Sequence, residues 1–126
     1  EMARKLLLKS EGLEVAAELN ASPVADLIWD ILPMKVSMNR WGDEYYGPPN
    51  VDFGDHPGEK GTEMKIGDLG WHAPNQWFCL FFGPTPASSG DAPAAAVPLL
   101  TVGHVRGDWT ALKEMGGAIT ARIDKA

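Results

Sequence analysis

Arg40 and Glu44 are the two charged residues whose types and spacing point most directly to binding chemistry. Arg40 continues one face of an alternating apolar segment that begins at Met34, so its guanidinium is expected at the edge of an apolar surface. Such a charge is costly to bury unless a carboxylate or a ligand pairs with it. Two interpretations follow: Arg40 binds an anionic or carbonyl group of a ligand, or its strand ends there and the side chain reaches water or pairs with Glu44.

Aromatic side chains are concentrated in two segments, residues 41–46 and 71–82. Pockets for small organic ligands or peptides are lined in this way, with few polar groups to orient the ligand, although the same rings also dominate hydrophobic cores. We expect core packing for Phe78 and a binding role for Tyr46 and Trp71, which lie beside expected turns. The candidate ligand-binding residues are Arg40, Trp41, Glu44, Tyr46, Trp71, Phe82 and Thr85.

The other polar and nucleophilic residues favour structural roles. Cys79 lies within an apolar segment, where burial raises the pKa of a thiol and makes it inert. Asp52, Asp55 and His56 share one loop, but their spacing is not that of a zinc site and a hard-ion site needs several converging ligands. Thr85 lies in a proline-rich loop, where either its hydroxyl reaches the rim of a cleft or the prolines only stiffen the connection. The sequence has no nucleophile elbow and no Gly-rich phosphate loop. We expect no metal and no cofactor.

The bulk composition argues against several classes of partner. The 126-residue chain has a net charge of −6 and no run of Lys or Arg, which argues against binding to nucleic acid and to anionic membrane surfaces. Its single cysteine excludes an internal disulfide, and no apolar run approaches the roughly 20 residues needed to cross a bilayer. We therefore expect a cytoplasmic protein with one domain over residues 1–126.

Alternation of apolar and polar residues predicts about eight short strands. The segment 13–19 is the clearest example, with one apolar and one wet face. The continuously apolar segment 77–82 is too short for a helix and is expected to be a strand buried on both faces. The strands are expected over residues 4–9, 13–19, 33–41, 44–46, 63–66, 69–72, 77–82, 97–105 and 118–124, with a brief pairing over 51–53 and a long loop over 83–95.

Two short helices are predicted between the strands. The first begins after Ser22, a good N-cap followed by a proline, and ends at Pro33. The second follows Asp108, spans residues 109–115 and is ended by two glycines. The apolar face of the first helix is expected to consist of Val24, Leu27, Ile28 and Ile31.

Three stretches of the chain resemble a known fold family. They are residues 41–46, residues 66–71 with Pro74 and 80–86, and residues 102–105 with Gly107 and Leu112. Their order resembles the cyclophilin-like barrel, and the chain is most similar to a small, uncharacterised prokaryotic family of that fold. The resemblance implies a mainly β protein: a closed cyclophilin-like β-barrel of about eight strands with two short helices. The resemblance does not extend to prolyl isomerase activity. The Phe-His-Arg run of true cyclophilins has no counterpart here, and the only glutamine is Gln76.

Three functions are compatible with these features of the sequence. The first is a binding module that holds a small molecule or a peptide in an aromatic cleft without catalysis. The second is an enzyme, a weak or altered peptidyl-prolyl isomerase, since an apolar pocket and one guanidinium are enough to favour a twisted amide. The third is a structural subunit or homodimer that uses exposed aromatic side chains.

Overall fold

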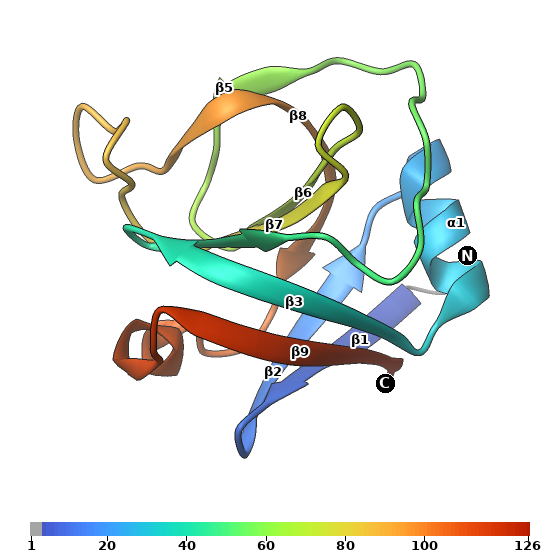
Figure 1. Cartoon of the computed structure of the whole chain (residues 1–126), viewed down its shortest axis with the longest axis horizontal. Helices are drawn as coiled ribbons and strands as arrows, with labels where there is room; N and C mark the ends of the chain where they lie inside the picture. Colours follow the sequence, from blue (N-terminus) through green and yellow to red (C-terminus); the bar gives the residue numbers. More distant parts are fainter. Residues whose placement is uncertain (1–3) are drawn as a thin grey trace.

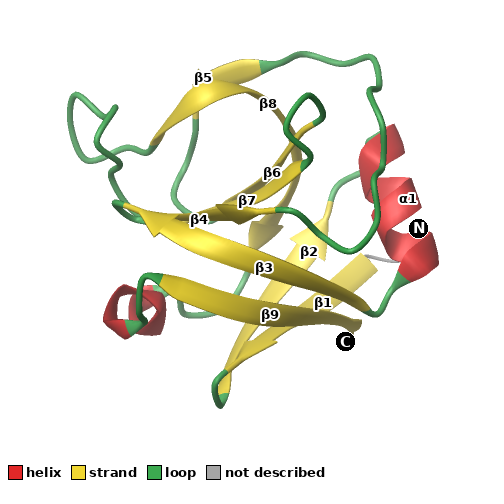
Figure 2. Cartoon of the chain, viewed as in Figure 1, coloured by secondary structure: helices red, strands yellow, loops and turns green. Residues whose placement is uncertain are grey.

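Eight antiparallel strands close into a barrel in the computed structural model, which describes residues 4–126 (Figures 1 and 2). Around the ring the strands follow the order β2-β1-β9-β3-β4-β7-β6-β8, and pairing of β2 with β8 closes it. The ninth strand, β5, pairs only with β8 and lies outside the ring. The elements are β1 (Arg4–Ser10), β2 (Leu13–Leu19), α1 (Pro23–Ile31), β3 (Met34–Trp41), β4 (Glu44–Gly47), β5 (Gly61–Glu63), β6 (Asp68–His72), β7 (Trp77–Phe81), β8 (Ala94–Val105), the 3₁₀ turn η1 (Thr110–Glu114) and β9 (Ala118–Lys125).

The predicted fold class, a mainly β closed barrel, is confirmed. Alternating residues of the strands point inward, as Met34, Val36 and Met38 do on β3, and each of these three is at most 2% exposed. Their cross-strand partners on β9 include Ile123 and Ile119, which face the same interior. Between residues 4 and 126, no helix is both long enough and apolar enough to span a bilayer.

Helix α1 begins as predicted, with a different buried face. The Ser22 hydroxyl accepts a hydrogen bond from the backbone N–H of Ala25, and Pro23 occupies the first turn. Val24, Ala25 and Ile28 are buried, whereas Leu27 and Ile31 are exposed to 37% and 36%. The predicted buried face was therefore wrong: the observed one is rotated about the helix axis by about one residue position. A helix of nine residues buries only one narrow stripe against the barrel.

Three other local predictions need correction. The second helix is a 3₁₀ turn of five residues with Trp109, not Asp108, at its N-cap; the Asp108 carboxylate accepts from the N–H of Thr110. Residues 51–53 form no strand, and the only pairing nearby is a bridge between Val36 and Pro49. Strand β5 covers residues 61–63 rather than 63–66, because Ile66 and Gly67 form the turn that leads into β6.

A second apolar layer covers the outside of the barrel over β4, β7 and β6. The first half of β8 leaves the ring, pairs with β5 and arches over these strands (Figure 1). Strand β7 is consequently buried on both faces, as predicted: Phe78 and Leu80 join the barrel core, whereas Cys79 and Phe81 join a second cluster with Leu99. This second layer creates the space in which the candidate site lies.

Gly47, at the end of β4, provides a test of this packing. A Cβ atom at this position would overlap the backbone carbonyl of Ser37 on β3, and backbone atoms have little freedom to move away. We expect Gly47→Ala to lower the free energy of unfolding by about 3 kcal/mol in urea denaturation. Gly61→Ala is the control, because nothing lies within 4 Å of the added Cβ, and equal stability of the two variants would contradict this assignment.

Candidate functional site

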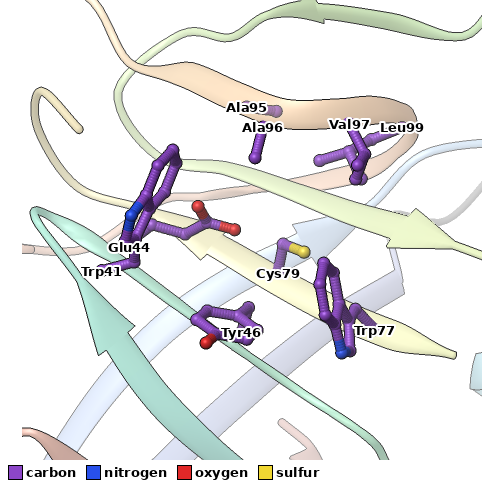
Figure 3. Close-up of a pocket in the computed structure, with 9 residues that line it drawn as sticks. All are labelled: Trp41, Glu44, Tyr46, Trp77, Cys79, Ala95, Ala96, Val97 and Leu99. Atoms are coloured by element: carbon purple, nitrogen blue, oxygen red, sulfur yellow. The ribbon is translucent and has the colours of Figure 1, made fainter. Parts of the chain in front are cut away.

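A cavity of about 240 Å³ lies between the outer face of the barrel and the first half of β8. Figure 3 shows the Trp41 and Trp77 indoles standing at opposite ends of this space, with the Glu44 carboxyl pointing into it between Trp41 and Cys79. The ring of Tyr46 lies beside that of Trp77, with centroids 4.9 Å apart in an edge-to-face arrangement. We name this the outer-face pocket; its lining residues are Trp41, Glu44, Tyr46, Trp77, Cys79, Ala95, Ala96, Val97 and Leu99.

Strand register brings the polar and aromatic residues of the pocket together. Glu44 pairs with Trp41 across the turn at Gly42 and Asp43, and directly opposed residues of antiparallel strands share one face. On the other side of β4, Tyr46 pairs with Cys79 of β7. Three of the seven predicted residues, Trp41, Glu44 and Tyr46, therefore lie in one pocket, and the positive φ of 60° at Gly42 supports the tight turn that joins two of them.

Among residues 4–126, Glu44 is the only charged residue that lines the outer-face pocket. The residue is 5% exposed, and within residues 4–126 the Cys79 thiol is the side chain that hydrogen bonds to its carboxyl, with no ion pair. Burial raises the pKa of Glu44 from 4.5 to about 7, an effect that the neighbouring Cys79 thiol partly opposes. Near neutral pH this carboxyl is therefore close to its midpoint of protonation.

Cys79 is a buried neighbour of Glu44, and its chemistry is limited by that position. Burial raises the pKa of its thiol well above 9.0, and the Glu44 carboxylate raises it further. The thiol is thus protonated at neutral pH and is a poor nucleophile. No group of three or more His, Cys, Asp or Glu side chains within residues 4–126 is arranged to hold a metal ion.

Arg40 lies on the opposite face of β3 from the pocket. Its guanidinium donates to the backbone oxygens of Gly42, Lys113 and Met115 at 2.8–3.0 Å. It also pairs with Asp43 at 2.8 Å and lies over the ring of Phe82, 5.0 Å from its centroid. The cation is therefore fully engaged by the protein, and it joins η1 to the end of the barrel. Its carboxylate partner is Asp43, because Glu44 of β4 pairs with Trp41 and lies with it on the other face of the sheet.

Asp43 completes this end of the barrel. Burial raises its pKa, but hydrogen bonds from Lys113 and Arg40 have the larger combined effect and hold the pKa below its ordinary value of 3.8. Lys113 contributes an ammonium 2.9 Å from the second carboxylate oxygen. The carboxylate is thus shared between β3 and η1, and it belongs to a structural cluster rather than to the outer-face pocket.

Three further candidate residues lie in the interior or in a loop. Trp71 is 1% exposed, and its indole N–H donates to the carbonyl of Gly54 in the loop between β4 and β5. Phe82 is fully buried. Thr85 is 6% exposed, and its hydroxyl donates to the carbonyl of Ala94 at 2.5 Å, which fixes the loop before β8. The structure does not bring Arg40, Trp71, Phe82 or Thr85 into the outer-face pocket.

Sequence reasoning missed the other half of the pocket. Trp77 was assigned no role, and the β8 residues Ala95, Ala96 and Val97 were expected in a loop or at the start of a strand. Alternation within β7 is the available signal for Trp77, because Trp77 and Cys79 share one face. The β8 residues give no such signal, since a run of alanines is compatible with any conformation.

The buried Glu44 carboxyl is expected to make stability depend on pH. The folded protein keeps its proton on Glu44 up to about pH 7, whereas the unfolded chain releases it near 4.5. The folded state therefore binds more protons between these values, and its stability falls as pH rises. Relative to Glu44→Gln, the wild type should lose about 2–3 kcal/mol of unfolding free energy between pH 4.5 and pH 8 in urea titrations. The exposed-loop control Glu59→Gln should follow the wild type; a constant difference between wild type and E44Q would refute the shifted pKa.

Comparison with known proteins places the chain in a family. The solution structure of the hypothetical protein AF2241 from Archaeoglobus fulgidus is similar, with a TM-score of 0.75 and 28% identity over 98% of this chain and 95% of that one. The structure of McbB in complex with tryptophan is similar in fold, with a TM-score of 0.70 and 17% identity over 95% of this chain and 44% of McbB. No curated protein matches the sequence. The Cyclophilin-like family profile matches residues 4–124, and the chain therefore belongs to the Cyclophilin-like family.

Proposed function

We propose that this protein binds a small, mostly apolar molecule in the outer-face pocket and does not transform it. The observation that carries the proposal is the lining itself: three partly exposed aromatic rings and an aliphatic wall surround a single buried carboxyl. Small-molecule sites have this composition, with many apolar contacts and few polar groups that fix orientation. A cavity with these features is preformed by the fold, so a ligand need not reorganise the barrel.

The size of the cavity favours a small molecule over a peptide. Its volume of about 240 Å³ corresponds to about eight water molecules at roughly 30 Å³ each. Drug-sized ligands occupy larger sites of about 300–1,000 Å³. A compound built on one ring, or an aliphatic chain of similar size, suits this space. McbB, 44% of which is similar to this chain in fold, has a structure in complex with the aromatic amino acid tryptophan.

The arrangement of reactive groups supports binding rather than catalysis. General acid–base chemistry needs a group positioned to exchange a proton, usually with a partner that orients it. Glu44 has no such partner within residues 4–126, and the adjacent Cys79 is protonated. The isomerase alternative relied on a guanidinium in the apolar pocket, and Arg40 is bound instead to three carbonyls on the opposite face.

Thermal-shift screening of small metabolites tests the proposal. A ligand selective for the folded state raises stability by about 2.7 kcal/mol at a concentration one hundred times its Kd. Ala96→Phe should abolish the shift given by any such ligand, because Ala96 is exposed at the wall of the pocket and a phenyl ring there fills the cavity.

Ala111→Phe is the matched control, since Ala111 is exposed on η1 and does not line the pocket. This variant should respond to ligands as the wild type does. Ligands that still stabilise the A96F variant bind elsewhere and would refute the proposal, as would the absence of any stabilising compound in a broad library.

A further inference from the structure

Glu44 is the one charged group among residues 4–126 that lines the outer-face pocket, and it has no strong hydrogen-bond donor there. An ionised carboxylate accepts at about four lone-pair sites, yet within residues 4–126 no Lys, Arg or His side chain lines the pocket to meet it. The thiol of Cys79, a weak donor, is its hydrogen-bond neighbour. An unpaired carboxylate in apolar surroundings is costly, so this position invites either a proton or a cation from outside the protein.

Other charged residues near Glu44 do have strong partners within the protein, and Arg40 is the clearest example. Arg40 pairs with Tyr45, next to the Trp41–Glu44 pair of the same hairpin, and its guanidinium makes four hydrogen bonds to the protein. Asp43, between them in sequence, is shared by Arg40 and Lys113. The fold therefore pairs Arg40 and Asp43 with protein groups. Glu44, which points into the cavity, is left without a charged partner.

Aromatic rings surround the open side of the carboxyl. Trp41 and Trp77 stand at the two ends of the cavity with Tyr46 beside Trp77 (Figure 3). The faces of such rings carry partial negative charge and attract organic cations, with Trp the strongest. Anions are disfavoured here by Glu44 and by the net charge of −6. A neutral ligand would fill the apolar space but leave the Glu44 carboxylate without a cationic partner.

We propose that the outer-face pocket selects a small organic ammonium ion: a primary amine on a ring-sized apolar group, with the ammonium on the Glu44 carboxylate and the apolar group between Trp41 and Trp77. This inference rests on the proposed binding function and names the class of ligand. The ammonium supplies charge-assisted hydrogen bonds to the buried oxygens, and the rings supply both apolar contact and cation–π attraction.

Binding of such a cation should depend on pH through Glu44. The other titratable groups that line the pocket among residues 4–126 are the Cys79 thiol on β7 and the Tyr46 phenol on β4, and the β8 wall carries no charged group. His72 on β6 lies behind Trp77, with its ring nitrogen bonded to the carbonyl of Pro98. Because the pKa of Glu44 is about 7 and the carboxylate is the binding form, affinity should fall about thirtyfold from pH 8 to pH 5.5.

Two probes of nearly equal shape isolate the role of charge. 2-Phenylethylamine stays protonated throughout this pH range, as a lysine side chain does, whereas 2-phenylethanol is uncharged. At pH 8, titration calorimetry with the wild type should show at least about tenfold tighter binding of the amine, the size expected of a hydrogen bond to a charged group. Glu44→Gln should remove both this preference and its pH dependence. Since His72 is unchanged in E44Q, a contribution from His72 would persist there.

Glu63→Gln is the control, because Glu63 is an exposed carboxylate on β5 outside the pocket. It should retain the preference for the amine. Equal affinity for the amine and the alcohol, or an amine preference that survives in E44Q, overturns the ammonium inference. If both probes bind equally and A96F blocks both, the pocket function stands without its charge selectivity; if neither probe binds and the metabolite screen also finds no ligand, both proposals fail.

Discussion

Strand β4 imposes the constraint on which the rest of this structure depends. It lies between β3 and β7, and its successive side chains alternate between the barrel interior and a second apolar layer outside. Tyr45 points inward and stacks on Phe82, whereas Glu44 and Tyr46 point outward. Both faces are covered because β8 leaves the ring and arches over this part of the sheet. A slip of one residue in the β3–β4 register would place a carboxylate in the barrel core and expose Tyr45.

The two faces treat charge in opposite ways. On the inner face, Arg40 enters an aromatic environment and is met by backbone carbonyls and by Asp43, so the ionic group becomes part of the connection between η1 and the barrel. On the outer face, Glu44 enters an equally apolar environment, and within residues 4–126 no basic side chain accompanies it. A buried charge with hydrogen-bond partners can connect structural elements, whereas a buried charge without partners lowers the stability of the fold. Positions that cost stability are where binding sites are expected.

The sequence was sufficient for the barrel and for part of the pocket. Clean alternation in segments such as 13–19 and 118–124 predicted strands, and the turn at Gly42 and Asp43 brought Trp41 close to Glu44. The same alternation contains the reason why Arg40 lies apart: it shares a face with Met38, not with Trp41. Strand pairing could not be predicted, because which strand lies beside β4 depends on contacts distant in sequence. The wall formed by β8 was missed for that reason, since alanines carry no periodic signal.

The central claim is that an ionisable carboxyl, without a strong protein partner, is held inside the outer-face pocket. Its most direct test is an NMR titration of the Glu44 side-chain carboxyl carbon in the uniformly labelled protein, followed by a repeat with saturating 2-phenylethylamine. We expect a midpoint near pH 7 for the free protein and a lower midpoint with the amine bound, because a nearby cation favours the ionised form. A midpoint at the ordinary value of 4.5 in the free protein would show that the Glu44 carboxyl is solvated and is not held in an apolar pocket.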